Sequence, residues 1–440
     1  MEQQPMQETH NIWERNRMLI KGFMVGFLIL IMLIPMALLD NLVNERRMRQ
    51  QQVTEEISSK WASSQTIVGP VVVLPYILRN DSGKVLAKRN LYLLPEQLNI
   101  KSKVVPEVRH RSLYDVTLYR SDITFTGIID PAAVQKLSIP QTDILWSEAH
   151  MVVGLDDARG LEDDVRLNWN NAAYVLEAGM SDNNVVKDGL SAGIVVDSQQ
   201  KTNFNISLKI KGSQFLYFTP TGKTTTASVT SSWKNPAFDG QYLPSQPASI
   251  TQDGFSANWK VLQVSRAYPQ AWVDANTFDI KRSAFGVKLL QPTDSYAKTE
   301  RTVKYALLII ALTFTIFFFV EIFQKKQIHP LQYILVGIAL CVFYTLLLSI
   351  SEYIGFNGAY AIASIATVAL IGLYVLGIFK KLQIAAGFAT ALGALYTYIF
   401  VLIQLQDYAL LFGSVGLFVI LAIIMYFSRK IDWYGIVKHQ

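Results

Sequence analysis

The stretch YALLIIALTFTIFFFVEIF, residues 305–323, decides the fold class of this 440-residue chain. Its single charge, Glu321, lies close to the end of an otherwise apolar run. A helix needs about 20 such residues to cross the roughly 30 Å apolar core of a bilayer. The stretch therefore predicts a membrane-spanning helix.

Five further stretches meet the same requirement. The first, 18–39, is interrupted only by Lys21, and no small-x-small cleavage site follows it, so we expect a retained anchor rather than a cleaved signal peptide. The other four follow the opening stretch at short intervals: 331–350, 360–379, 384–405 and 408–427. Short polar links make neighbouring helices antiparallel. The pattern predicts an integral membrane protein with a six-helix transmembrane bundle.

Composition and charge agree with this prediction. Charged residues make up 17% of the chain, whereas soluble domains usually contain about 25%. The net charge of +6 divides into +1 for residues 40–300 (28 basic, 27 acidic) and +5 for the rest, which argues against a nucleic-acid partner. The lone Cys341 excludes a disulfide framework and a Cys-based zinc site.

Alternate short loops carry the positive charge and so predict the orientation. Basic residues follow the second, fourth and sixth stretches, at Lys325, Lys326, Lys380, Lys381, Arg429, Lys430 and Lys438. The other links, 351–359 and 406–407, contain no Lys or Arg. Positive loops stay in the cytoplasm, so both termini are expected there and residues 40–300 outside. Arginines at 46, 47 and 49 oppose this orientation, but long domains translocate largely regardless of charge.

The region between the first two stretches predicts a large β-rich domain. Residues 40–64 are polar and are expected to extend the first helix as a stalk, or to form a plain connector. Apolar and polar residues alternate along 113–119 and 122–129, as half-buried strands require. Many short strands separated by Gly and Pro are typical of a sandwich-like sheet assembly.

Motifs spread over nearly the whole chain resemble the CreD-like inner-membrane proteins of bacterial cell envelopes. They include Val68-Gly69-Pro70, the run 153–160 (VGLDDARG), Gly254-Phe255, the run 301–313 and Asp432-Trp433-Tyr434. The resemblance implies an inner-membrane location, a periplasmic outer domain and a role in envelope integrity and stress response. It implies no enzymatic reaction. The partners it suggests are the lipid bilayer and an envelope lipid or a periplasmic or membrane protein.

Together these observations predict a domain order. It comprises a cytoplasmic N-terminus (1–17), helix 1 (18–39), a helical stalk (40–64), a periplasmic β-rich domain (65–300), helices 2–6 (301–427) and a cytoplasmic C-terminus (428–440).

Glu321 is the first candidate functional residue, because an ionisable group inside a span is costly. One reading is a structural ion pair, with Lys325 at i,i+4 or with Lys21 at a similar depth. The other is a proton or substrate role. His329 follows in the next loop, where it is either a proton shuttle for Glu321 or a polar interface residue.

Four charged residues are expected near the outer membrane surface: Glu352, Asp407, Arg301 and Lys304. They could form an ion-pair cluster that docks the outer domain, or be independent interface charges. The acidic residues around Arg159 do not have EF-hand spacing, so Asp156 or Asp157 is expected to pair with Arg159 in a turn. Two small-residue pairs, Gly387 with Ala391 and Ala389 with Gly393, predict close helix packing.

Hydrolase, P-loop and dinucleotide signatures are absent from the sequence, so we predict no catalytic residue, cofactor or metal. The first functional hypothesis is envelope maintenance, with the outer domain binding an envelope component or a protein partner. The second is transport or extrusion of a lipidic or hydrophobic substrate, with Glu321 as the coupling residue. A membrane enzyme acting near Glu352 and Asp407 is a third.

Overall fold

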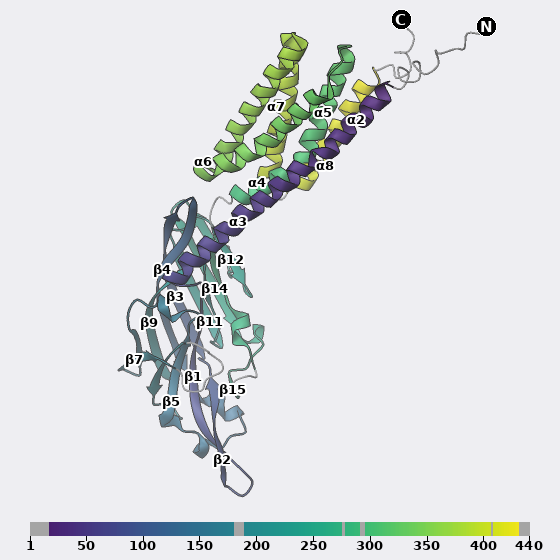
Figure 1. Cartoon of the computed structure of the whole chain (residues 1–440). Coiled ribbons are helices and arrows are strands. Elements are labelled where there is room, and N and C mark those ends of the chain that lie inside the picture. The colour runs from purple at the N-terminus through teal and green to yellow at the C-terminus, as the bar shows by residue number, and fades with distance from the viewer. Residues whose placement is uncertain (1–16, 180–188, 275–277, 291–294, 406–407, 431–440) are drawn as a thin grey trace, which may run out of the picture. The chain divides into compact units, whose positions relative to one another are not determined.

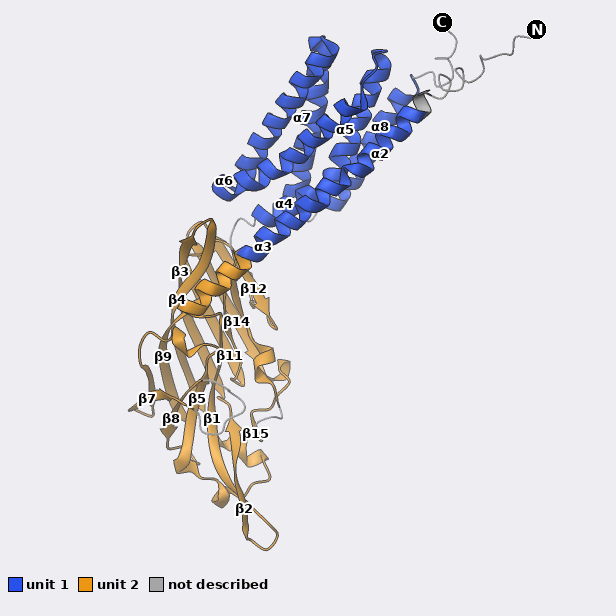
Figure 2. Cartoon of the chain, in the orientation of Figure 1, with its two compact units in different colours: residues 1–49, 293–440 blue, residues 50–292 orange. Residues whose placement is uncertain are grey.

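The computed structural model describes residues 17–179, 189–274, 278–290, 295–405 and 408–430. The chain divides into two compact units (Figure 2). Residues 1–49 and 293–440 form one, which we call the helical unit. Residues 50–292 form the other, which we call the β unit.

The helical unit is built mainly from long apolar helices, together with the short polar helix α4. They are α2 (Arg17–Ile31), the first part of α3 (Leu33–Trp61), α4 (Ser295–Lys304), α5 (Ala306–Phe323), α6 (Pro330–Phe379), α7 (Leu382–Gln404) and α8 (Ala409–Ser428). Within the described residues, five segments are long and apolar enough to cross a membrane: Ile20–Trp61, α5, α6, α7 and α8. The prediction of a membrane protein with several apolar helices is confirmed.

Helix α6 folds back on itself at Gly355. A straight helix of its 50 residues would be about 75 Å long. Gly355 instead has φ 76° and ψ 166°, a conformation that glycine adopts without the strain of a side chain. The rings of Phe343 and Tyr360 lie 5.5 Å apart, although 17 helical residues would separate them by about 25 Å. The two arms of α6, 330–354 and 356–379, therefore lie side by side (Figure 1).

Aromatic packing joins the helices at the core of this unit. Phe317 of α5 contacts the rings of Tyr333 at 4.8 Å, Phe388 at 5.8 Å and Phe379 at 6.4 Å. These partners come from both arms of α6 and from α7. In a membrane, lipid chains cover apolar helix surfaces as well as another helix does. Helices therefore associate through close van der Waals packing of this kind. Helix α8 has no buried residue within its described span.

The β unit contains a single hydrogen-bonded path of strands. The strands are β1 (Gln65–Arg79), β2 (Val85–Leu93), β3 (Gln97–Arg111), β4 (Tyr114–Ile129), β5 (Ala149–Gly154), β6 (Val165–Trp169), β7 (Ala172–Ala178), β8 (Gly189–Ile194), β9 (Thr202–Ser213), β10 (Phe215–Phe218), β11 (Thr224–Ser231), β12 (Pro236–Gly240), β13 (Ser249–Thr251), β14 (Gly254–Leu262), β15 (Ala271–Val273) and β16 (Phe285–Leu289). Their order is β12-β16-β10-β1-β5-β8-β7-β6-β9-β4-β3-β11-β14-β13, with β2 and β15 branching from β1.

Aromatic contacts show that this path doubles back on itself. Phe238 of β12 packs against Phe255 and Trp259 of β14, which stands near the other end of the path. Trp259 also contacts Phe285 of β16 at 5.6 Å. Strands from both ends therefore face each other across one core, where each fully buried large apolar side chain contributes about 1.5–3 kcal/mol. The prediction of a large β-rich domain is confirmed.

Candidate functional site

Glu321 lies in the last turn of α5 and is 5% exposed. Its Oε1 accepts hydrogen bonds from Lys21 Nζ of α2 and from the Ile328 backbone N–H at 3.0 Å. Its Oε2 accepts from the Tyr333 hydroxyl of α6 at 2.9 Å. One carboxylate thus joins three helices and the loop between two of them. We call these residues, Lys21, Glu321, Ile328 and Tyr333, the inner clasp.

Local chain geometry decides which lysine reaches Glu321. Helix α5 ends at Phe323, and Lys325 has φ 49°, outside the helical range. The i,i+4 pairing expected for a continuing helix therefore does not form, and Lys21 forms the ion pair with Glu321. Tyr333 was not a sequence candidate, because its approach to Glu321 depends on the turn between α5 and α6.

His329 begins α6 instead of contacting Glu321. Its Nδ1 accepts from the Leu331 N–H at 3.3 Å, and its own N–H donates to Gln332 Oε1 at 3.2 Å. This reciprocal pair caps the helix, with Pro330 at its first position. Within the described ranges no hydrogen bond links His329 to Glu321.

The basic loops gather at the same end of the helical unit as the inner clasp. Lys326 Nζ donates to the Ile378 carbonyl at the end of α6, and Lys381 Nζ donates to Gln324 Oε1 at 3.1 Å. The ring of Phe427, at the end of α8, lies 6.4 Å from that of Phe323. Residues 325–326, 380–381 and 429–430 therefore share one end of the unit.

The opposite end carries a second polar network. Glu352 of α6 accepts from the Tyr296 hydroxyl of α4 at 2.9 Å and lies 3.9 Å from Arg46 Nε of α3. No ion pair joins Glu352 to Arg301 or Lys304 in the part of the chain that the structure describes. Asp407 lies outside the described residues.

Lys304 has a neighbour on its own helix as its partner. It pairs with Glu300 at 2.8 Å, and Arg47 of α3 pairs with the same carboxylate at 3.0 Å. Lys304 first, and then Arg47, lower the pKa of Glu300. Arg301 lies on the same helix and is half-buried. Two glutamates, on α4 and α6, thus each receive an arginine from α3.

A lysine that the sequence did not single out completes this end. Lys298 Nζ donates to Gln404 Oε1 at 3.0 Å and lies 5.7 Å from the ring centre of Phe356. Gln404 Nε2 in turn donates to Asn357 Oδ1 at 2.7 Å. Helices α4, α6 and α7 therefore meet through polar side chains beside the reversal at Gly355. The composition of α4, which is mainly polar, was the only sequence signal for this contact.

In the β unit, part of the acidic stretch forms a turn at residues 157–160, which we call the latch. Asp157 accepts from Arg159 Nε at 2.9 Å and Nη2 at 2.8 Å, and from the Ser63 N–H at 3.0 Å. Arg159 Nη1 also donates to the Ser59 carbonyl at 2.9 Å. The Arg159 guanidinium holds the pKa of Asp157 well below its usual range. Among the described residues no group of three or more His, Cys, Asp or Glu could hold a metal ion.

Gly160 lets the latch pack closely against β1 and β9. A Cβ at this position would lie 2.5 Å from the Lys211 carbonyl and 2.7 Å from Gln65 Nε2, too close for either. Trp61, the last residue of α3, is surrounded by the cations of Arg109 at 4.3 Å, Lys211 at 4.9 Å and Arg120 at 5.4 Å. The motif residues 157–160 therefore fix the end of α3 against the strands.

Two comparisons with known proteins match nearly the whole chain. The family model described as "Inner membrane protein CreD" matches residues 17–434. The chain is also similar to the inner membrane protein CreD of Escherichia coli strain K12. The two are 30% identical over 418 residues, and the match covers 92% of this chain and 92% of the Escherichia coli protein.

Proposed function

Because the chain belongs to the CreD family of inner-membrane proteins, we propose that it supports cell-envelope integrity and the response to envelope stress. In this proposal the β unit lies in the periplasm and binds an envelope component or a protein partner. The main support is that residues 50–292, more than half of the chain, form a unit with its own core. A membrane anchor alone needs no such domain.

The arrangement of the helices supports a topology with six crossings. Each arm of α6 contains about 24 residues, enough to cross a bilayer core of about 30 Å once. Counting the arms separately turns five apolar helices into six spans. The end that gathers residues 325–326, 380–381 and 429–430 is the cytoplasmic end by the positive-inside rule. Both termini are then cytoplasmic, and the β unit, inserted between spans one and two, is periplasmic.

Single-cysteine labelling tests this topology. In a Cys341→Ser background, a membrane-impermeant maleimide should label Val264→Cys in intact spheroplasts, because Val264 is 91% exposed in the β unit. Lys325→Cys and Lys380→Cys should react only after permeabilisation. Labelling of all three from the same side would overturn the proposed orientation.

In-cell photo-crosslinking tests the proposed binding role. A photoreactive amino acid replaces Val264 or Leu243, both exposed and apolar in the β unit, or Leu410 of α8 as the lipid-facing control. We expect the β-unit positions to capture an envelope component that the control does not capture.

The same exposed positions should matter for function, which a complementation assay tests. In cells that lack the wild-type protein, Val264→Asp should accumulate normally yet fail to restore retention of a periplasmic reporter enzyme under detergent stress. Full restoration by Val264→Asp and Leu243→Asp would contradict the binding role.

A second function, transport or extrusion of a lipidic or hydrophobic substrate, is favoured by one observation. Glu321 is an acidic residue inside the helical unit and contacts three separate elements, so a change in its protonation would reach all of them. Under this hypothesis Glu321→Gln abolishes export while folding and abundance stay unchanged. Loss of the folded protein would instead support a structural clasp.

A further inference from the structure

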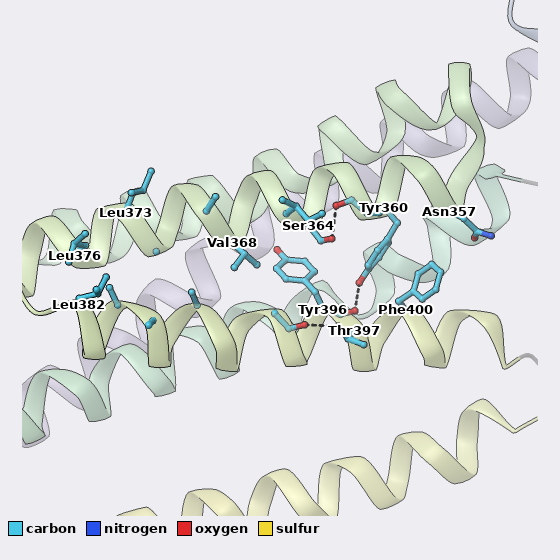
Figure 3. Close-up of a pocket in the computed structure, with 18 residues that line it drawn as sticks. Asn357, Tyr360, Ser364, Val368, Leu373, Leu376, Leu382, Tyr396, Thr397 and Phe400 are labelled. Atoms are coloured by element: carbon cyan, nitrogen blue, oxygen red, sulfur yellow. Dashed lines mark hydrogen bonds between the residues drawn. The ribbon is translucent and has the colours of Figure 1, made fainter.

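Small residues on two sides of α7 border two cavities. Ala389 also packs close to α6, since a Cβ added to Gly372 would lie 3.4 Å from the Ala389 Cβ. Gly387 and Ala391 line a cavity of about 880 Å³ shared with α5 and α8. Ala389 and Gly393 line a groove of about 730 Å³ between α7 and the second arm of α6 (Figure 3). A Cβ added to Gly387 or Gly393 would meet no atom within 4 Å. The close packing expected at these two glycines is therefore wrong, because both face open space.

The groove between α6 and α7 has the dimensions and lining of a site for a hydrocarbon chain. Its lining on α7 extends from Leu382 to Phe400, about 27 Å of helix, which is nearly the depth of a bilayer core. Val368, Leu373 and Leu376 form part of the opposite wall on α6. Both walls belong to membrane-spanning helices, so the molecules with access to the groove are components of the bilayer.

Tyr396 provides a polar group inside this apolar groove. It is 2% exposed, its ring projects from α7 toward α6 (Figure 3), and within the described residues its hydroxyl has no hydrogen-bond partner. The other hydroxyls of the lining are bonded to carbonyls: Tyr360 to that of Tyr396 at 2.8 Å, Ser364 to that of Ala361 and Thr397 to that of Gly393. Leaving a buried hydroxyl unpaired is costly, so the Tyr396 hydroxyl is a candidate donor to an oxygen of a molecule bound in the groove.

A positive charge stands at one end of the groove. Asn357 lines that end and is linked through Gln404 to Lys298. Among the described residues no carboxylate forms an ion pair with Lys298, whereas its helix neighbour Lys304 pairs with Glu300. A lysine held by neutral partners beside an apolar groove is complementary to an anionic head on a hydrocarbon chain.

We propose that the α6–α7 groove binds one acyl chain of an anionic phospholipid. The headgroup lies at the Asn357 end, where Lys298 attracts its phosphate. The Tyr396 hydroxyl donates a hydrogen bond to an oxygen of the lipid. This site goes beyond the role proposed for the β unit and does not depend on it.

Photolabelling of the purified full-length chain tests the site. The probe is phosphatidylglycerol with a diazirine on one acyl chain, and labelled peptides are identified by mass spectrometry. We expect label on 361–376 and 385–397. Gly393→Leu places a side chain in the groove and should reduce the labelling of these peptides at least about fivefold. The matched variant Gly387→Leu fills the other cavity and should leave their labelling unchanged.

Two milder variants keep the proposal testable if Gly393→Leu fails to fold. Tyr396→Phe removes one oxygen at nearly constant shape and should lower labelling about threefold or more. Lys298→Gln should lower labelling by phosphatidylglycerol but not by phosphatidylethanolamine bearing the same chain. The proposal is overturned if Tyr396→Phe and Lys298→Gln are both labelled as strongly as the wild type. Label spread equally over all lipid-facing helices would also overturn it. So would crosslinks between two chains that place a second copy in the groove.

Discussion

Two carboxylates, Glu321 in the helical unit and Asp157 in the β unit, are held in contrasting ways. Glu321 takes its donors from residues 300, 12 and 7 positions away, on α2, α6 and the loop after α5. Asp157 takes its main donor from Arg159, two positions away, whose side chain is 66% exposed. A carboxylate surrounded by membrane helices has no water to solvate it and needs partners from several helices. Asp157 instead takes its cation from a local turn, so removing the cation should cost more at Glu321 than at Asp157.

The chain contains separate reporters for the two regions. Cys341 is buried in α6, so we expect it to react with a thiol dye only when the helical unit opens. Six of the eight tryptophans, Trp61, Trp146, Trp169, Trp233, Trp259 and Trp272, belong to the β unit, and the described helices of the other unit contain none. Thiol reactivity and tryptophan fluorescence therefore follow the melting of each unit in the same sample.

Removing the partner of Glu321 should have the largest effect. Lys21→Met leaves a buried carboxylate without its cation, which costs about 3–5 kcal/mol when one member of a buried pair is removed. We expect a much lower Tm by Cys341 reactivity and an unchanged tryptophan Tm. Lys325→Met is the matched control, because Lys325 lies at the same end of the unit but does not pair with Glu321.

A double variant separates charge burial from loss of packing. Lys21→Met with Glu321→Gln should recover part of the lost Tm, because no uncompensated charge remains. If Lys21→Met melts like Lys325→Met, the inner clasp does not hold the helices together and the contrast with Asp157 fails.

The inner clasp also shows how far the sequence could predict this molecule. Lengths of apolar runs located the spans, since the thickness of the bilayer fixes them, and Lys21 was a candidate partner by its depth. The i,i+4 rule also suggested Lys325, which the structure excludes because α5 ends at Phe323. The contribution of Tyr333 follows from the loop geometry between two helices, which no local pattern encodes. Likewise, residues 351–359 were expected as a polar link, yet the reversal is concentrated at Gly355 in an otherwise helical segment.

Gly160→Ala should give the second largest effect, now in the β unit. The added Cβ would lie 2.5 Å from a backbone carbonyl, so the latch or the strand must shift, at a cost of about 1–3 kcal/mol. The tryptophan Tm should fall while the Cys341 Tm stays constant. Gly193→Ala is the control, because a Cβ there meets nothing within 4 Å. Equal melting of the two glycine variants would show that the latch tolerates displacement.

Lowering the pH should reduce the stability that the latch contributes. The pKa of Asp157 is lower in the folded chain than its ordinary value near 4, because Arg159 stabilises the charged form. The stabilisation is therefore complete above about pH 5 and is lost as the pH falls below about 4. Asp157→Asn should lower the tryptophan Tm at pH 7 by less than Gly160→Ala does. The difference from wild type should shrink toward about pH 3. A difference that stays constant across this range would rule out the charge as its origin.

The smallest effect should come from Glu56, an exposed counterpart of Glu321 in α3. Glu56 pairs with Lys60 at 2.7 Å and with Arg111 at 2.8 Å, and these bonds, that of Lys60 first, lower its pKa to about 2. All three side chains are more than 40% exposed, so water and salt screen the attraction, and ordering long side chains offsets it. Glu56→Gln should change the tryptophan Tm by less than about 2 °C, both at about 20 mM and at about 0.5 M salt. A drop as large as that of Gly160→Ala would mean that a carboxylate in water can fix structure as firmly as one among membrane helices. Exposure would then not be the property that separates Glu321 from Glu56.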